Sequence, residues 1–205
     1  MLRTHFITVA LAGAAAWLLQ GCAGPPSLDQ AIRPGDEAAY RTLVSGGQTP
    51  GEAFLRDKAR TQQISLQDAR AHDEALSVSD NPFRRRSDPG AVSRGAVIYK
   101  NECMACHGEH ADGRGPQMPV TLASMDFHRT AIRMDITMRG GAVKKWFGII
   151  QNGTTAVATA PDGSPLAVTM PSFGARLARE QIWLVVTYLQ SLNADIPAHD
   201  TTGHE

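Results

Sequence analysis

The pentapeptide Cys103-Met104-Ala105-Cys106-His107 constrains this chain more than any other feature of its sequence. Two thiols three positions apart, followed directly by an imidazole, can form two thioether bonds to the vinyl groups of a haem while the histidine ligates the iron. The spacing therefore predicts one covalently bound haem c, attached through Cys103 and Cys106, with His107 as an axial ligand of the iron. The covalent links would hold a large apolar cofactor in a small protein.

Other uses of a cysteine pair fit the sequence less well. A structural zinc ion needs four protein ligands, and the three cysteines of the chain leave no second pair to complete such a site. A thioredoxin-like redox pair needs a βαβ context, and no such pattern surrounds Cys103. Haem attachment is therefore the interpretation on which the other expectations depend.

The N-terminus has the features of a bacterial export signal. Arg3 precedes an uninterrupted run of apolar and small residues at 7–19, which is too short to span a bilayer as a mature helix. The run ends in Leu19-Gln20-Gly21-Cys22, which resembles the lipobox of bacterial lipoproteins. The resemblance implies a signal peptide at 1–21 and an acylated Cys22 at the mature N-terminus. A soluble periplasmic protein with an ordinary signal is the alternative.

The cysteine count agrees with a lipid anchor, because haem uses two cysteines and the third lies at the processing site. Several acyl chains anchor a protein stably. We therefore expect the protein on the periplasmic side of a bacterial membrane, and Ala23 after Cys22 weakly favours the outer membrane by the same resemblance. Twenty basic and twenty acidic residues balance, so the charge does not indicate nucleic acid as a partner.

Residues 22–87 are predicted to form a tether and a polar, partly helical or flexible extension. Helix starts are visible at Thr49-Pro50-Gly51-Glu52, a capping-box pattern, and at Ser65-Leu66-Gln67-Asp68. The extension has too few large apolar side chains for a core of its own. It packs on the haem domain or on a partner, or it stays mobile. The run Arg84-Arg85-Arg86 is interpreted as a solvated linker, with a docking patch for an acidic partner or lipid phosphate as the alternative.

The haem domain is predicted at 88–193, opening with a helix capped by Asp88. Gly95, Tyr99 and Cys103 recur every four residues and so share one helical face. Gly95 and Tyr99 ahead of the haem motif resemble the N-terminal helix of class I cytochromes c, in which this glycine lets the C-terminal helix cross at close range. The matching helix is predicted at 179–192. The resemblance implies an all-α class I cytochrome c fold around one covalently bound haem.

The same resemblance implies the remaining contacts of the iron. Met170-Pro171-Ser172-Phe173 precedes the last helix, as the family's methionine motif does, so Met170 is expected to be the sixth ligand. Met118, also followed by proline, is its main rival. Pro116 matches by context the proline whose carbonyl binds the iron-ligating histidine and fixes its ring. The other side chains considered as the sixth ligand are Met125, Met134, Met138, His110 and His128, of which His110 is interpreted as a surface residue.

Two further elements are expected between these ligands. Residues 142–151 predict a helix that Asn152-Gly153 stops, with Trp146 either packing in the core or reaching a haem propionate. Residues 154–169 exceed the usual connection of the family, and the turn sequence at 160–164 predicts a small hairpin or flap. It would cover the haem edge, contact a partner or be an inert surface insertion. Residues 194–205 are predicted to form a flexible tail.

These expectations converge on outer-sphere electron transfer by a mono-haem carrier between membrane-associated or periplasmic redox proteins. An iron with both axial positions filled leaves no place for a substrate, and no nucleophile or proton-transfer constellation indicates an enzyme. One alternative is a tightly bound cytochrome subunit of a respiratory complex, such as an alternative quinol-oxidising complex, or of a dehydrogenase. The other is a haem sensor or small peroxidase with a displaceable sixth ligand.

Overall fold

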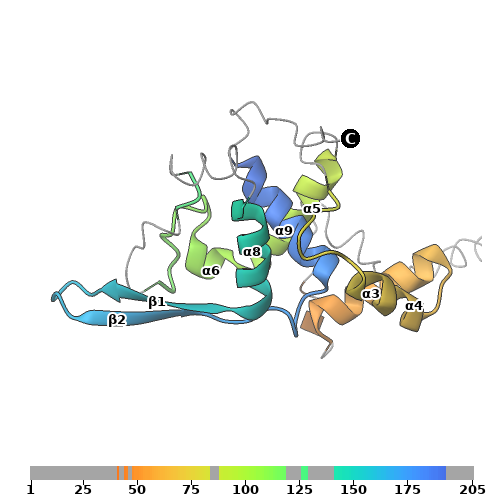
Figure 1. The fold of residues 1–205 in the computed structure, drawn as a ribbon, viewed down its shortest axis with the longest axis horizontal. Helices are drawn as coiled ribbons and strands as arrows, with labels where there is room; N and C mark the ends of the chain where they lie inside the picture. The colour runs from red at the N-terminus through yellow and green to blue at the C-terminus, as the bar shows by residue number, and fades with distance from the viewer. Residues whose placement is uncertain are drawn as a thin grey trace, which may run out of the picture.

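Two crossing helices, α5 (Pro89–Glu102) and α9 (Arg179–Ser191), organise the chain in its computed structural model (Figure 1). The structure describes residues 41, 44–45, 48–83, 88–118, 126–128 and 141–192. Around α5 and α9 lie α3 (Pro50–Gln62), α4 (Leu66–Glu74), α6 (Met104–His107), α8 (Gly141–Asn152), β1 (Thr154–Thr159) and β2 (Pro165–Met170). The predicted export signal at 1–21, Cys22, the arginine run at 84–86 and the tail at 194–205 lie outside the described residues. Within those residues, none of the helices combines the length and the apolar character needed to span a bilayer.

The crossing of α5 and α9 depends on Gly95. A Cβ atom placed on Gly95 would lie 2.1 Å from the carbonyl oxygen of Leu184, so a larger residue would force the helices apart. One helical turn later, the rings of Tyr99 and Tyr188 pack with their centroids 5.1 Å apart. The start of α5 is also as predicted, because the Asp88 carboxylate accepts a hydrogen bond of 2.8 Å from a backbone amide in the first turn. The close crossing expected from the sequence is confirmed.

Helix α9 is the centre of the hydrophobic core. Every residue from 181 to 187 is buried, which is the pattern of a helix covered on all its sides. One side packs on α5. Another side faces α8, where the rings of Phe147 and Trp183 lie with centroids 4.5 Å apart. The remaining side of α9 is covered by the N-terminal extension.

The extension packs on this core instead of standing apart from it. Helix α3 contributes three buried side chains to the same hydrophobic cluster as α5 and α9, namely Ala53, Phe54 and Leu55. Thr49 and Ser65 cap α3 and α4 as predicted, each accepting a backbone hydrogen bond three residues ahead. The predicted capping box is only half formed, because Arg56 and Arg70 bind the Glu52 carboxylate. Of the three placements that the sequence left open, packing on the haem domain holds for residues 50–83.

Helix α4 supplies the N-terminal cap that α9 lacks in its own sequence. The residue before α9 is Ala178, whose methyl side chain cannot accept a hydrogen bond. The buried carboxylate of Asp73 accepts hydrogen bonds from the backbone amides of Arg179 and Glu180, at 2.8 and 2.9 Å. A carboxylate in this position satisfies donors that a helix leaves free at its first turn and is attracted by the helix dipole.

Polar contacts continue from Asp73 along the length of α9. The Trp183 indole donates to the carbonyl of Ser77 at 3.0 Å, and the Asn81 amide donates to the Thr187 hydroxyl at 2.9 Å. The partners of Asp73, Ser77 and Asn81 follow one another at intervals of about one turn on α9, so the segment from α4 to Asn81 runs beside the helix. The extension is therefore part of the fold, and removing it would expose the buried side of α9.

A hairpin follows α8 directly. Gly153, with φ of +75°, ends α8 at the predicted position. Strands β1 and β2 then pair antiparallel, from Thr154 opposite Met170 to Thr159 opposite Pro165. This confirms the hairpin predicted at 154–169. Figure 1 shows it projecting from the helical body, at the end away from α3 and α4. The body is all-α as expected, and the hairpin is the one sheet among the described residues.

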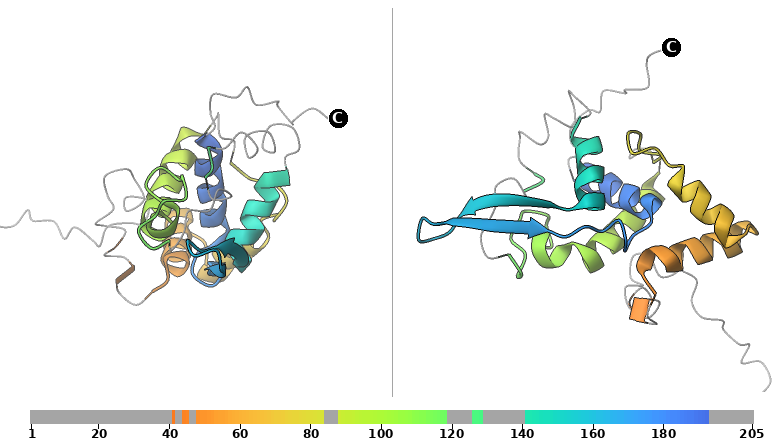
Figure 2. Two further views of the ribbon diagram at one scale, coloured as in Figure 1. Left: turned by 90° about the vertical axis from the view of Figure 1, so that its left-hand side faces the viewer. Right: turned by 60° about the horizontal axis from the view of Figure 1, so that its bottom comes forward.

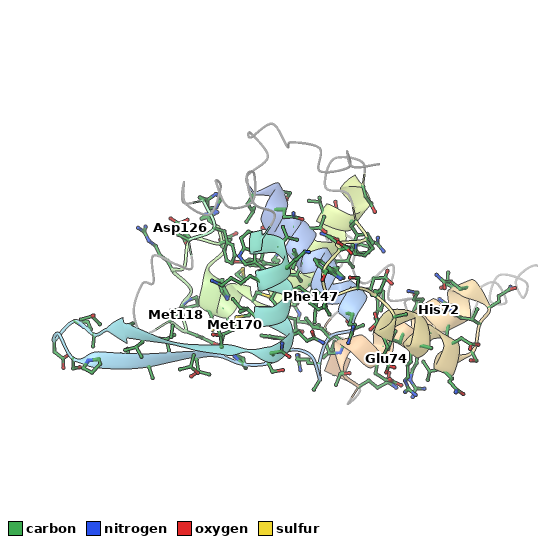
Figure 3. The ribbon with its side chains drawn as sticks, in the orientation of Figure 1. His72, Glu74, Met118, Asp126, Phe147 and Met170 are labelled. Carbon is green, nitrogen blue, oxygen red and sulfur yellow. The ribbon has the colours of Figure 1, made fainter. Side chains whose placement is uncertain are left out.

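The cap from α4 can be tested by paired substitutions in two adjacent carboxylates. We expect Asp73→Ala to lower the free energy of unfolding by about 1–2 kcal/mol, because two amides at the start of α9 lose their acceptor. Glu74→Ala, at an exposed position next to it (Figure 3), should change the free energy of unfolding by less than about 0.5 kcal/mol. Denaturant unfolding of the haem-containing protein measures both. Equal losses in the two variants would contradict the capping role.

Candidate haem site

The two thiols and the imidazole lie at the junction of α5 and α6. Cys103 ends α5, and Cys106 and His107 lie on α6. Both thiols are free and half-buried. Burial, together with the negative charge of Glu102, raises the pKa of the Cys103 thiol to about 12. Redox-active cysteine pairs have lowered pKa values, so this protonated thiol argues against a thioredoxin-like role and leaves the pair available for thioether bonds.

The loop after α6 folds back and fixes this short helix. The backbone amides of Gly113, Gly115 and Gln117 donate to the carbonyls of three successive α6 residues, at 3.0, 3.1 and 2.9 Å. A Cβ atom on Gly115 would lie 2.3 Å from the carbonyl carbon of Cys106. The loop can therefore approach α6 this closely only with glycine at position 115.

A buried tyrosine fixes the other end of the haem motif. The Tyr99 hydroxyl donates a hydrogen bond of 2.7 Å to the carbonyl of Gly108. Burial raises the pKa of Tyr99 well above its ordinary value, so the hydroxyl keeps its proton and remains a donor. Because Tyr99 also contacts α9 through Tyr188, this bond ties the residue after His107 to the central helix crossing.

The His107 imidazole is half-buried, with its Nδ1 atom fully buried, and is held in its neutral form. Burial lowers the pKa of His107, and the neutral ring is the form that ligates a metal. Its Nδ1 atom has no hydrogen-bond partner among the described residues, although an unpaired buried nitrogen is costly. The hydrogen bond predicted between His107 and the Pro116 carbonyl is thus not formed in this structure. The backbone amides of the residues on either side of Pro116, Gly115 and Gln117, instead donate hydrogen bonds to carbonyls of α6.

Phe127 is a site residue that the sequence did not indicate. Its buried ring lies between His107 and Trp146, with centroid distances of 5.7 and 5.2 Å, and it meets Trp146 edge-on. A single phenylalanine in a polar segment carries no periodic signal, so its burial could not be read from the pattern. Trp146 therefore packs against another aromatic side chain, which is one of the two roles expected for it.

The two methionines considered as sixth ligands come from different elements (Figure 3). Met170 ends β2 and packs, half-buried, against the hydrophobic core. Met118 is half-buried on the loop after α6, where its amide donates to the Gly115 carbonyl at 3.0 Å. His110 and His128 are both exposed, and the His128 ring is bonded to the His110 carbonyl at 2.6 Å. The remaining candidates, Met125, Met134 and Met138, lie outside the described residues.

The segment that carries Met170 is fastened to the end of α8. A Cβ atom on Gly153 would lie 2.7 Å from the carbonyl oxygen of Met170, so the two backbones touch. The Ser172 hydroxyl and the Phe173 amide donate to carbonyls in the last turn of α8, at 2.6 and 2.9 Å. The motif Met170-Pro171-Ser172-Phe173 therefore has a fixed backbone.

Together these residues fit a covalently bound haem. The donor set is two thiols, a neutral imidazole and a thioether, which suits iron in a porphyrin better than a bare cation. Partly buried apolar side chains pack against the core from α6, from α8 and from the segment after Met170, namely Met104, Val143, Trp146 and Phe173. Apolar side chains on the elements that carry or hold the donors are suited to cover an apolar ring.

Comparison with known proteins supports this interpretation of the site. A family model described as Cytochrome c matches residues 92–193. The match begins inside α5 and extends through α9, so it contains the haem motif and both methionines. No curated protein shows a significant match to the chain.

The contact between Gly153 and Met170 can be tested against a second glycine in the same hairpin unit. Gly153 and Gly163 both have positive φ, of +75° and +85°, but a Cβ on Gly163 would meet nothing within 4 Å. We expect Gly163→Ala to cost about 1 kcal/mol of unfolding free energy from backbone strain alone. Gly153→Ala should cost more, because its methyl group would also collide with the Met170 backbone. Denaturant unfolding measures both, and equal costs would refute the steric contact.

Proposed function

Because residues 92–193 belong to the cytochrome c family, we propose that this chain carries single electrons through one haem c, with His107 and Met170 as axial ligands. The family binds haem c covalently and serves haem-based electron transfer. Cys103 and Cys106 supply the two thioether bonds. The bound haem contributes reversible one-electron chemistry at its iron.

The observation that carries the ligand assignment is the independent anchoring of Met170. The two axial ligands of a haem iron must approach from opposite faces of the ring. Met118 belongs to the loop that is hydrogen-bonded to α6, the helix that carries His107. Met170 is held by α8 instead, through Gly153 and the last turn of that helix. This arrangement supports Met170, rather than Met118, as the ligand opposite the imidazole.

The residues of the chain have defined roles in this function. The neutral imidazole of His107 and the fixed Met170 would hold the iron in the same way in both oxidation states, so that little would rearrange when an electron arrives. A methionine ligand raises the reduction potential relative to a second histidine. Apolar side chains that pack against the core, such as Trp146 and Phe173, would exclude water from the bound ring. Partners then exchange electrons without a chemical step on the protein.

The ligand assignment is tested by the absorption spectrum of the ferric protein. A methionine sulfur bound to ferric haem gives a weak band in the deep red. We expect this band to disappear in Met170→Ala and to survive in Met118→Ala, because only the first change removes the ligand. Mass analysis of both variants should show the covalently attached haem. Loss of the band in Met118→Ala alone would reverse the assignment.

We further propose that a lipid on Cys22 holds the protein at the periplasmic side of a bacterial membrane, where its partners are redox proteins. The lipobox-like sequence before Cys22 supports this. Val44 is the most N-terminal of the described residues that pack on the core. The chain between Cys22 and Val44 is then the tether that separates the haem domain from the membrane.

The anchor can be removed without touching the haem domain. We expect Cys22→Ser to shift the protein from the membrane fraction to the soluble fraction, because no acyl chain can be attached. The haem content should be unchanged, since Cys22 takes no part in haem attachment. Fractionation of the native host followed by haem staining measures both. A Cys22→Ser protein that stays with the membranes would show that another contact holds it there.

A further inference from the structure

The hairpin has two faces that the ladder register identifies. Val168 lies opposite Ala156, and Val157 lies opposite Ala167. Because alternate residues of a strand point to opposite faces, Val168 shares the face of Met170, whereas Val157 lies on the other face. We call the face of Met170 the inner face and the face of Val157 the outer face.

The two faces differ in exposure. On β2 the three inner-face residues, Leu166, Val168 and Met170, are half-buried, and the residues between them are exposed. On β1 the inner-face residue Ala158 is 9% exposed, whereas its neighbour Val157 on the outer face is 75% exposed. All strand residues of the hairpin that are not exposed therefore lie on the inner face, although Thr154 and Ala156 on that face are exposed.

The inner face is also an apolar strip without charge. Residues 154–170 contain one ionisable side chain, Asp162, which lies in the turn and accepts two hydrogen bonds from Ser164. An isolated two-stranded hairpin is marginal in water and needs a packing surface for one face. The strip of Leu166, Val168 and Met170 supplies such a surface, and its base is the side chain proposed as the iron ligand.

The hairpin is placed so that this strip continues from the haem site. Figure 2, in the view along the hairpin, shows the segment of α6 and helix α8 on either side of α9, with the hairpin running below them. The base of the hairpin is fixed to α8 at Gly153. The strands therefore start at the site and extend outward from it.

We propose that the inner face of the hairpin, with Leu166 and Val168 beside Met170, is a flap that covers the haem on its methionine side. The proposal rests on ligation of the iron by Met170. The flap keeps water and small ligands from that side of the iron. Exclusion of water disfavours the more highly charged ferric state, so the flap also raises the reduction potential.

Two valines of the hairpin allow a matched test. Val168 and Val157 both lie within a strand opposite an alanine, but on the inner and outer faces. We expect Val168→Asn to bring water to the covered side, to lower the reduction potential and to tighten cyanide binding to the ferric protein by about tenfold. Val157→Asn should leave both quantities as in the unaltered protein. Redox titration and cyanide titration measure them.

The outcomes separate this proposal from the assignment of Met170. If the unaltered ferric protein lacks the deep-red methionine band, the ligand assignment fails, and the flap proposal fails with it. If the band is present and the two asparagine variants behave alike, the flap proposal alone is overturned. Should Val168→Asn unfold the hairpin, the pair Val168→Thr and Val157→Thr decides, since threonine keeps the shape and strand preference of valine. Equal potentials and cyanide affinities in that pair would also overturn the proposal.

Discussion

The contact of Gly95 with the backbone of α9 sets the position of the two segments that carry the proposed iron ligands. The missing side chain at Gly95 allows α5 and α9 to touch, and Tyr99, one turn later, ties the end of the haem motif to this crossing. Helix α9 also packs on α8 through Trp183, and α8 holds the backbone of Met170. His107 and Met170 are therefore positioned relative to the same helix, although they come from different elements.

Residues 88–192 alone do not satisfy a helix α9 that is buried on all its sides. The backbone amides of its first turn need acceptors that Ala178 cannot supply, and its third side needs apolar cover. Asp73 and α3 provide both, from a segment that precedes the matched cytochrome c range. The folding unit is thus longer than the family match. A region that looks like a polar spacer in the sequence is structural, which leaves a shorter part of the extension for a tether or a partner.

The features that could be predicted from the sequence are those governed by local chemistry. Caps at Thr49, Ser65 and Asp88, and the stop at Gly153, follow from hydrogen bonds or backbone angles within a few residues. The cap from Asp73 could not be predicted, because an aspartate within a polar helix does not reveal which distant helix end it will meet. The sequence also did not show that two arginines, one of them 18 residues away, would bind the Glu52 carboxylate in place of its expected local hydrogen bond. Phe127 lies directly between two polar residues in the sequence, so no apolar pattern marks its burial.

The sequence of the hairpin does not indicate whether it covers the site or is a surface insertion, whereas the burial of its residues in the structure distinguishes its two faces. Its strands alternate small, β-branched and apolar residues on both faces, so their composition does not distinguish cover from surface. Packing does distinguish them, because the half-buried Leu166, Val168 and Met170 and the buried Ala158 all lie on the face of Met170. A methionine on a paired strand also has its direction fixed by the pleat, and its ladder partner, Thr154, follows the glycine that touches it. As the proposed sixth ligand, a methionine held in this way would move little between oxidation states, which is the property an electron carrier needs.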